Sequence, residues 1–171
     1  TFREVLYSED PDYAFWAPTG LVYEDTNSRV YAYDFESDTI RLIYDFGVTP
    51  DDTIKFYVFR GYYGMSNLLR IALIESVDSV FFADKYRKQI HLMYLDEQNC
   101  WTEEIWIEGV GSLLGVMNAG TGDIVGSTNE LLCYWENGEL KYGSVCYVSN
   151  VGIEQKYNTK VDVTVCPNPV S

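Results

Sequence analysis

Most of this chain divides into short runs of alternating side chains that are separated by turn residues. The run RVYAYDF (29–35) alternates strictly, with Tyr31, Tyr33 and Phe35 on one face and smaller or polar side chains on the other. No stretch repeats apolar residues at the helical spacing over three turns. The sequence therefore predicts an all-β fold, an antiparallel β-sandwich or barrel with ten or more short strands and little or no helix.

The clearest hairpin signal is LLCYWENGELKY (131–142), in which Asn137–Gly138 lies between two apolar arms. Asn-Gly favours a two-residue type I′ turn because both central residues of that turn adopt positive φ. Such a turn predicts three cross-strand pairs, namely Glu136–Glu139, Trp135–Leu140 and Cys133–Tyr142.

Two other stretches carry local signals. TPDD (49–52) predicts a turn, because Pro and Asp both favour turn positions. The apolar run 68–82 is long for one strand, and we expect it to bend near residues 76–78.

The glycine-rich stretch WIEGVGSLLG (106–115) differs from a dinucleotide-binding fingerprint in its spacing, G-x-G-x-x-x-G. A phosphate-binding turn must follow a buried parallel strand and open a helix, and no such unit is visible around this stretch. We therefore expect Gly109, Gly111 and Gly115 to turn the chain rather than to bind phosphate.

The charge of the chain limits its partners. It has 171 residues, enough for one domain with a sizeable core, and a net charge of −14. An acidic surface repels phosphate backbones and anionic lipids, so nucleic acid is not an expected partner. No apolar run approaches the ~20 residues of a transmembrane helix. The start at Thr1 fits either a mature form whose signal peptide has been removed or a trimmed sequence.

The four cysteines are widely spaced, and His91 is the single histidine, so the sequence predicts no Cys/His zinc site, no other metal site and no cofactor. In an exported protein the four cysteines can form two disulfides by any of three connectivities. Cys133 and Cys146 flank the predicted hairpin and are the expected pair, provided that a bulge near residues 143–144 corrects their register. Free buried thiols remain the alternative.

Trp106, Glu104 and Glu108 form the candidate ligand-binding set. If Ile105 and Ile107 face the core, Trp106 lies between two carboxylates on the opposite face of the strand. An exposed indole beside acceptor groups can stack on a sugar ring or anchor a protein partner. The alternative is that a second layer of the fold covers Trp106.

No catalytic residues are assigned. Glu104 and Glu108 would lie ~13 Å apart along a strand, farther than the ~5–9.5 Å of a glycosidase carboxylate pair. A secreted hydrolase that uses acidic residues remains an alternative, and so does a β-barrel carrier of a small apolar ligand. The favoured interpretation is a non-catalytic domain that binds an extracellular glycan or protein through aromatic side chains.

The end of the chain, VDVTVCPNPVS (161–171), resembles the opening of the C-terminal sorting domain of type IX secretion cargo, in which an alternating strand precedes Pro-Asn-Pro. Cys166 stands where that family often has an aromatic residue. The resemblance implies a division into an all-β domain at 1–159 and the start of a sorting domain at 160–171. It also implies that the tail engages the type IX secretion machinery.

Four upstream blocks resemble ordered blocks of a group of secreted Bacteroidetes proteins that carry the same kind of tail. The resemblance implies export across both membranes, removal of a signal peptide, and a secreted or outer-surface location. It implies no catalytic residues. The blocks are LIYDFGVTPDDTI (42–54), YRKQIHL (86–92), WIEGVGSLLG (106–115) and LLCYWENGELKY (131–142).

Overall fold

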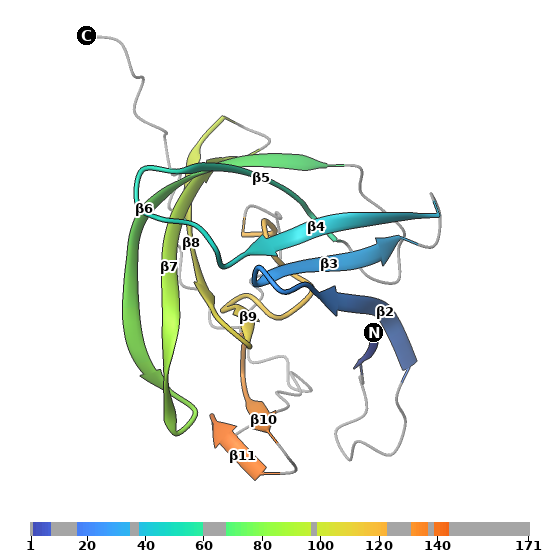
Figure 1. Ribbon diagram of the computed structural model, residues 1–171. Coiled ribbons are helices and arrows are strands. Elements are labelled where there is room, and N and C mark those ends of the chain that lie inside the picture. The colour runs from blue at the N-terminus through green and yellow to red at the C-terminus, as the bar shows by residue number, and fades with distance from the viewer. Residues whose placement is uncertain are drawn as a thin grey trace, which may run out of the picture.

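The computed structural model shows two antiparallel sheets and a separate hairpin (Figure 1). It describes residues 2–7, 17–34, 38–59, 68–96, 99–122, 131–136 and 139–143. The strands are β1 (Arg3–Tyr7), β2 (Ala17–Glu24), β3 (Arg29–Asp34), β4 (Thr39–Asp45), β5 (Thr53–Tyr57), β6 (Leu69–Phe82), β7 (Lys85–Leu95), β8 (Trp101–Ile107), β9 (Gly111–Ser112), β10 (Tyr134–Glu136) and β11 (Glu139–Tyr142).

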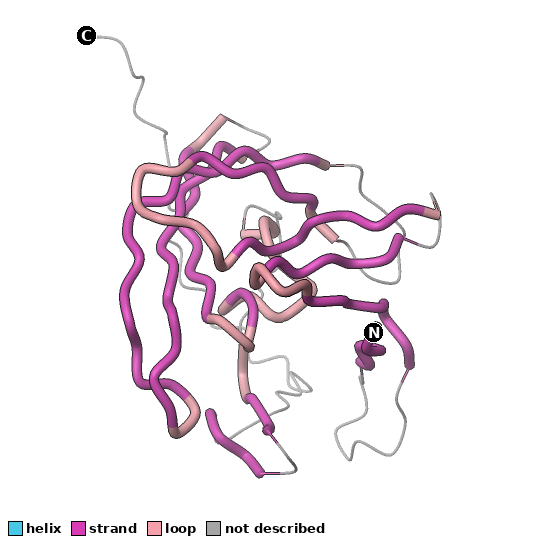
Figure 2. Tube along the Cα trace, in the orientation of Figure 1, coloured by secondary structure: helices cyan, strands magenta, loops and turns pink. Residues whose placement is uncertain are grey.

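Both sheets follow the order of the chain. One has the order β1-β2-β3-β4 and the other β5-β6-β7-β8-β9, while β10 and β11 pair with each other. Figure 2 shows strands joined by turns and loops, with no helix in the described part of the chain. The predicted all-β, antiparallel fold is confirmed, because sequential strands connected by short turns pair with their neighbours.

The five-stranded sheet curves strongly along β6 and β7, so that it forms a half-barrel (Figure 1). The register between these two strands shifts between Ile74 and Ser76, which is a β-bulge at the place where the sequence predicts a bend. Residues 68–82 thus form one long bent strand. The turn between β6 and β7 places Ala83 and Asp84 at φ values of 53° and 65°.

The core lies between the two sheets. The four-stranded sheet contributes Ala32, Ile43 and Tyr44, and the half-barrel contributes Ile74 and Trp106 among others. A second, smaller cluster lies on the other side of β8. Strand β8 is therefore covered on both faces over its second half, which decides the orientation of its side chains. The smaller cluster contains Phe82, Ala83, Ile107 and Val110, with Ile105, Leu113, Leu131 and Tyr134 among the side chains packed against it.

The glycine-rich stretch turns the chain, as the sequence predicts. Gly109, Gly111 and Gly115 have φ values of 74°, 103° and 115°, and the first two lie in or beside the turn that joins β8 to β9. At Gly111 an added Cβ would lie 3.1 Å from the hydroxyl oxygen of Tyr44, so a side chain has little room there. The stretch opens no helix and so offers no helix N-terminus to a phosphate.

The predicted TPDD turn is also confirmed. Asp51 adopts a φ of 70°, and the Asp52 carboxylate accepts hydrogen bonds from the amide and the hydroxyl of Thr49 at 2.7 and 2.9 Å. These contacts hold the pKa of Asp52 below its ordinary value, chiefly through the amide of Thr49. The two acidic residues therefore form a turn.

The β10–β11 hairpin keeps two of the three predicted pairs, Trp135–Leu140 and Glu136–Glu139. The third prediction is wrong, because a register shift after Tyr134 places that residue, and not Cys133, opposite Tyr142. Asn137–Gly138, Cys146 and the tail at 160–171 lie outside the described residues. Neither Cys100 nor Cys133 is a free thiol. The Cys133–Cys146 bridge stays a prediction.

Candidate functional site

The structure does not assemble Trp106, Glu104 and Glu108 into a surface site. Trp106 is 0% exposed and Glu104 is 4% exposed, and both face the space between the sheets. Ile105 and Ile107 pack on the opposite side of β8, so the predicted orientation of this strand is inverted. Glu108 is half-buried in the turn after β8. The expectation that Trp106 stacks on an external ligand is therefore wrong.

Glu104 and Trp106 instead form a buried polar contact. The indole Nε1–H donates to Glu104 Oε1 at 2.7 Å, and the amide of Gly120 donates to Oε2 at 2.8 Å. The hydroxyls of Ser112 and Tyr94 donate to the same carboxylate. Burial raises the pKa of Glu104, and these four hydrogen bonds oppose that rise. The carboxylate thus has donors from four separate positions, and they offset part of the cost of burying it.

This arrangement does not support a hydrolase centred on Glu104. Glu103, the residue before Glu104, is exposed and points to the opposite face of β8. His91 lies on the neighbouring strand, and its Nε2 lies 2.7 Å from Nε2 of Gln89, as expected of a satisfied strand residue. Among the described residues, no group of three His, Cys, Asp or Glu side chains could hold a metal ion.

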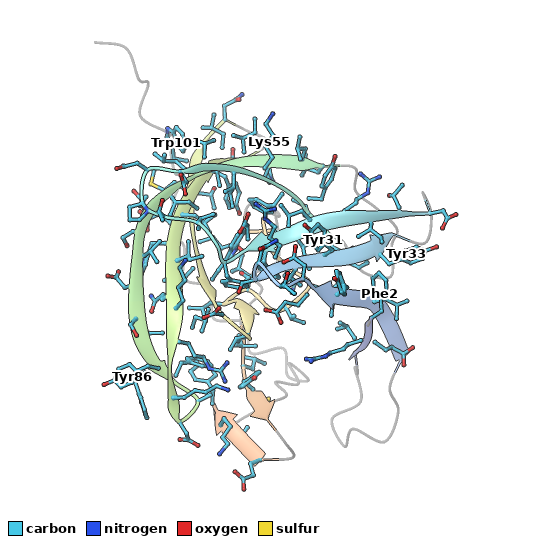
Figure 3. All side chains as sticks on the ribbon, viewed as in Figure 1. Phe2, Tyr31, Tyr33, Lys55, Tyr86 and Trp101 are labelled. Carbon is cyan, nitrogen blue, oxygen red and sulfur yellow. The ribbon has the colours of Figure 1, made fainter. Side chains whose placement is uncertain are left out.

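A strip of aromatic side chains covers the outer face of the four-stranded sheet. We call Phe2, Tyr23, Tyr31 and Tyr33 the aromatic strip. The Tyr23 and Tyr31 rings are stacked, with centroids 6.2 Å apart and planes inclined by 29°. Phe2 bridges the strip, with its centroid 5.7 Å from that of Tyr23 and 6.3 Å from that of Tyr33. Figure 3 shows Phe2, Tyr31 and Tyr33 together on this sheet.

The pairing of the strands explains why these rings share a face. Tyr23 lies opposite Tyr31 across the β2–β3 ladder, and cross-strand partners project to the same side. The alternate residues of these strands, Val22, Val30 and Ala32, face the core. The strip is therefore the outward face, and its tyrosines remain half-exposed because no layer of described residues covers them.

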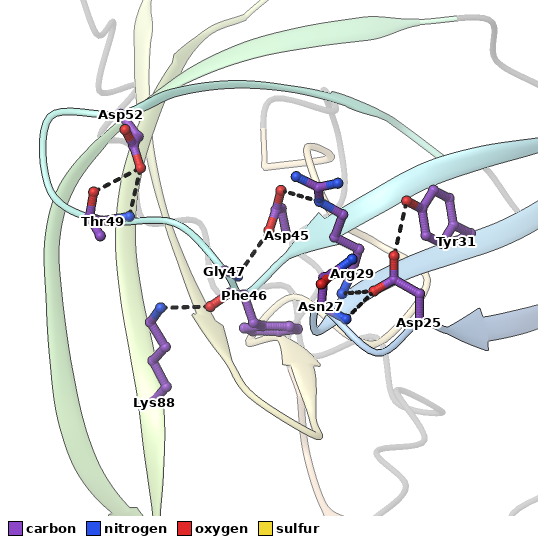
Figure 4. Close-up of polar contacts among 10 residues, drawn as sticks. All are labelled: Asp25, Asn27, Arg29, Tyr31, Asp45, Phe46, Gly47, Thr49, Asp52 and Lys88. Atoms are coloured by element: carbon purple, nitrogen blue, oxygen red, sulfur yellow. Dashed lines mark hydrogen bonds and ion pairs between the residues drawn. The ribbon is translucent and has the colours of Figure 1, made fainter.

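Carboxylates lie along the margin of the strip. Asp25 Oδ1 accepts the amides of Asn27 and Arg29 at 2.8 and 3.0 Å, while its Oδ2 accepts the Tyr31 hydroxyl at 3.4 Å (Figure 4). The pKa of Asp25 is lowered, chiefly by the amide of Arg29, so the group is ionised at neutral pH. Each carboxylate oxygen accepts more than one hydrogen bond, so Oδ2 has capacity for a further donor.

Two more ionisable groups continue this polar margin. The Arg29 side chain donates through Nε to Asp45 Oδ2 at 2.9 Å (Figure 4), and this contact raises the pKa of Arg29. Arg29, Asn27 and Asp45 line an open polar hollow beside the Asp25 turn. At the opposite end of the strip, the Tyr33 hydroxyl donates to Asp38. The strip thus combines an apolar surface with hydrogen-bonding groups at both ends.

The interior of the fold is packed where an apolar ligand would have to lie. Trp106 makes edge-to-face contacts with Tyr44 and Phe56, each with centroids 4.9 Å apart. A half-open hollow of 440 Å³ remains between the inner side of the four-stranded sheet and the β8–β9 turn. Arg3, Glu24 and Asp25 lie at its lining, so it does not match an enclosed apolar cavity.

Sequence reasoning placed Tyr31 and Tyr33 on one face of a strand but did not identify that face as the exposed one. The signal was present, because two large rings alternate with Val30 and Ala32, and the small residue suits a close-packed inner face. Tyr23 and Phe2 join the strip only through strand pairing.

No protein family, curated protein or solved structure matches this chain. In the described part of the chain, no helix is long and apolar enough to cross a bilayer.

Proposed function

We propose that this protein is a non-catalytic glycan-binding domain and that the aromatic strip is its binding surface. The observation that carries the proposal is the contiguous set of ring contacts joining Phe2, Tyr23, Tyr31 and Tyr33 on an outer sheet face. Solvent-accessible aromatic side chains gathered in one patch are typical of interaction sites.

The chemistry of the strip suits a sugar chain. The C–H face of a pyranose ring is apolar and packs on the face of an aromatic ring. The hydroxyl groups around that ring donate to carboxylates, and such charge-assisted hydrogen bonds are stronger than neutral ones. Asp25 Oδ2 lies within hydrogen-bonding distance of the Tyr31 hydroxyl, so one sugar unit can contact both groups. The surrounding acidic charge favours neutral glycans over sulfated or uronic ones.

We also propose that the domain is exported, to the medium or to the outer cell surface, and that its C-terminal tail engages the type IX secretion machinery. The resemblance of the tail and of four upstream blocks to secreted proteins supports this location. Neither described cysteine is a free thiol, which agrees with an oxidising compartment.

The test is binding of the full chain to a glycan panel that includes neutral and acidic polysaccharides. We expect binding to neutral glycans, and we expect Tyr31→Ala to weaken it at least tenfold, because that change removes a stacking ring and the hydroxyl beside Asp25. Tyr86→Ala is the matched control. Tyr86 is 75% exposed, and it lies on the β6–β7 hairpin, far from the strip (Figure 3).

Two outcomes would contradict the proposal. Absence of binding to every glycan would remove the ligand class, and equal binding by Tyr31→Ala and the unmodified chain would remove the site. A far-UV circular dichroism spectrum of each variant shows that a loss of binding does not come from unfolding.

A further inference from the structure

The outer face of the half-barrel carries a second surface of large side chains. Unlike the aromatic strip, it consists mainly of aliphatic residues. We call Leu69, Ile71, Leu73, Leu95 and Trp101 the apolar patch. Ile71 is 54% exposed and Trp101 is 60% exposed.

Strand pairing makes the patch contiguous. Leu95 lies directly opposite Trp101 across the β7–β8 ladder. Because Ala72 lies opposite Tyr94 in the β6–β7 ladder, the next pair along it brings Ile71 beside Leu95. Figure 3 shows Trp101 at the same end of the half-barrel as Lys55, which lies opposite Ile71 in the β5–β6 ladder. A run of large apolar side chains over three strands is typical of a surface that another segment covers.

Cys100 lies beside this patch. It precedes Trp101, and its amide donates to Asp96 Oδ1 at 2.6 Å, which fixes the start of β8. Neither Cys100 nor Cys133 is a free thiol, so each has a bonded partner. The chain holds two further cysteines, Cys146 and Cys166.

The hairpin favours Cys146 as the partner of Cys133. Gly143 follows β11 with a φ of 79°, and an added Cβ there would lie 2.0 Å from the carbonyl oxygen of Leu132. The backbones on either side of the hairpin therefore approach closely beside Cys133. Cys146 lies three residues after Gly143, a reach of about 10 Å, which is enough to return to Cys133. This assignment leaves Cys166 for Cys100.

We propose that the segment 161–166 (VDVTVC) docks on the apolar patch and is held there by a Cys100–Cys166 disulfide. In an extended conformation Val161, Val163 and Val165 share one face, and the polar side chains of Asp162 and Thr164 point away from it.

The dimensions of the segment agree with those of the patch. The three valines span ~13 Å, and the distance from β8 across β7 to β6 is ~10 Å. The two Cα atoms of a disulfide lie ~5.5 Å apart, which brings Val165 within reach of the Trp101 ring. Residues 144–165 can extend over roughly 70 Å, so the connection does not restrict where the segment lies.

This proposal does not depend on glycan binding. The first test is a disulfide map of the full chain, digested without reduction by trypsin together with a protease that cleaves after Glu. Each cysteine then lies in a different peptide, and mass spectrometry identifies the linked pairs. We expect peptide 98–103, which contains Cys100, to be linked to peptide 161–171, which contains Cys166. We expect peptide 131–136, with Cys133, to be linked to peptide 142–154, with Cys146. A link from Cys100 to Cys133 or Cys146 would overturn the proposal.

The second test measures the accessibility of Trp101 in the full chain. The signal of Trp101 is the difference in acrylamide quenching between each protein and its Trp101→Phe counterpart. We expect Val163→Asp to raise the quenching of Trp101 several-fold, because it places a charge on the apolar face of the segment. The matched control Thr164→Asp places the same charge on the polar face and should leave quenching unchanged. Equal quenching in the unmodified chain and in Val163→Asp would show that the segment does not cover Trp101.

Discussion

Replacing Trp106 by phenylalanine tests the central claim about the core, namely that the indole is both a packing element and a hydrogen-bond donor. Trp106 is fully buried, and its Nε1–H donates to Glu104 Oε1 at 2.7 Å. Phenylalanine keeps an aromatic ring at this position but has no donor. The change therefore separates the polar role of Trp106 from most of its apolar role.

The expected cost follows from these contacts. A hydrogen bond to a charged group contributes about 1.5–3 kcal/mol, and its loss leaves a buried carboxylate with one donor fewer. The smaller ring also weakens the edge contacts with Tyr44 and Phe56, each worth about 0.5–1.5 kcal/mol, though phenylalanine retains part of them. We expect Trp106→Phe to lower the free energy of unfolding by about 2–4 kcal/mol, a large share of the ~5–15 kcal/mol typical of a domain.

The assay is urea denaturation followed by far-UV circular dichroism at neutral pH, with Trp101→Phe as the control on the same strand. Trp101 is exposed, so its replacement by another large apolar residue should cost less than about 1 kcal/mol. Equal costs for the two substitutions would refute the reasoning, because they would mean that the structure misplaces the two faces of β8.

Two further predictions concern the same core. Because the pKa of Glu104 is raised in the folded state, the folded protein keeps that proton to higher pH than the unfolded chain does, so this group makes stability fall as pH rises above 4.5. The side chain of Glu104→Gln cannot titrate. Urea denaturation over a pH series should therefore show the free energy of unfolding of the unmodified chain falling relative to that of this variant as pH rises. A difference that stays constant with pH would contradict the raised pKa. Gly111→Ala should cost about 1–3 kcal/mol, because Gly111 has a φ of 103° and an added Cβ would lie 3.1 Å from the Tyr44 hydroxyl oxygen. An unchanged midpoint in thermal denaturation would show that the turn can adopt another conformation.

Local sequence signals predicted the elements of this fold well, because strand alternation and turn chemistry depend on neighbouring residues. The bend in the run 68–82 and the TPDD turn are both present. The turn between β6 and β7 has a weaker signal, since Asp84 suits positive φ but Ala83 does not. The long β6–β7 ladder, which pairs Phe82 with Lys85, helps to hold Ala83 in this conformation.

The inner and outer faces of the strands were harder to assign. In β8 the sequence suggests that isoleucines face inward and that Glu104 faces outward, because an isolated carboxylate is costly to bury. The donors that make its burial tolerable come from Tyr94, Ser112 and Gly120, on other strands and turns. No spacing within β8 reveals them.

The sequence by itself determined that this chain is all-β, where most of its strands and turns lie, and that Tyr31 and Tyr33 share a face. These properties follow from residues close together in the chain. Only the tertiary structure decided that Trp106 is buried and that Tyr23, Tyr31, Tyr33 and Phe2 form one strip on an outward sheet face. The physical reason is that burial depends on what packs against each face of a sheet, and those partners come from distant parts of the chain.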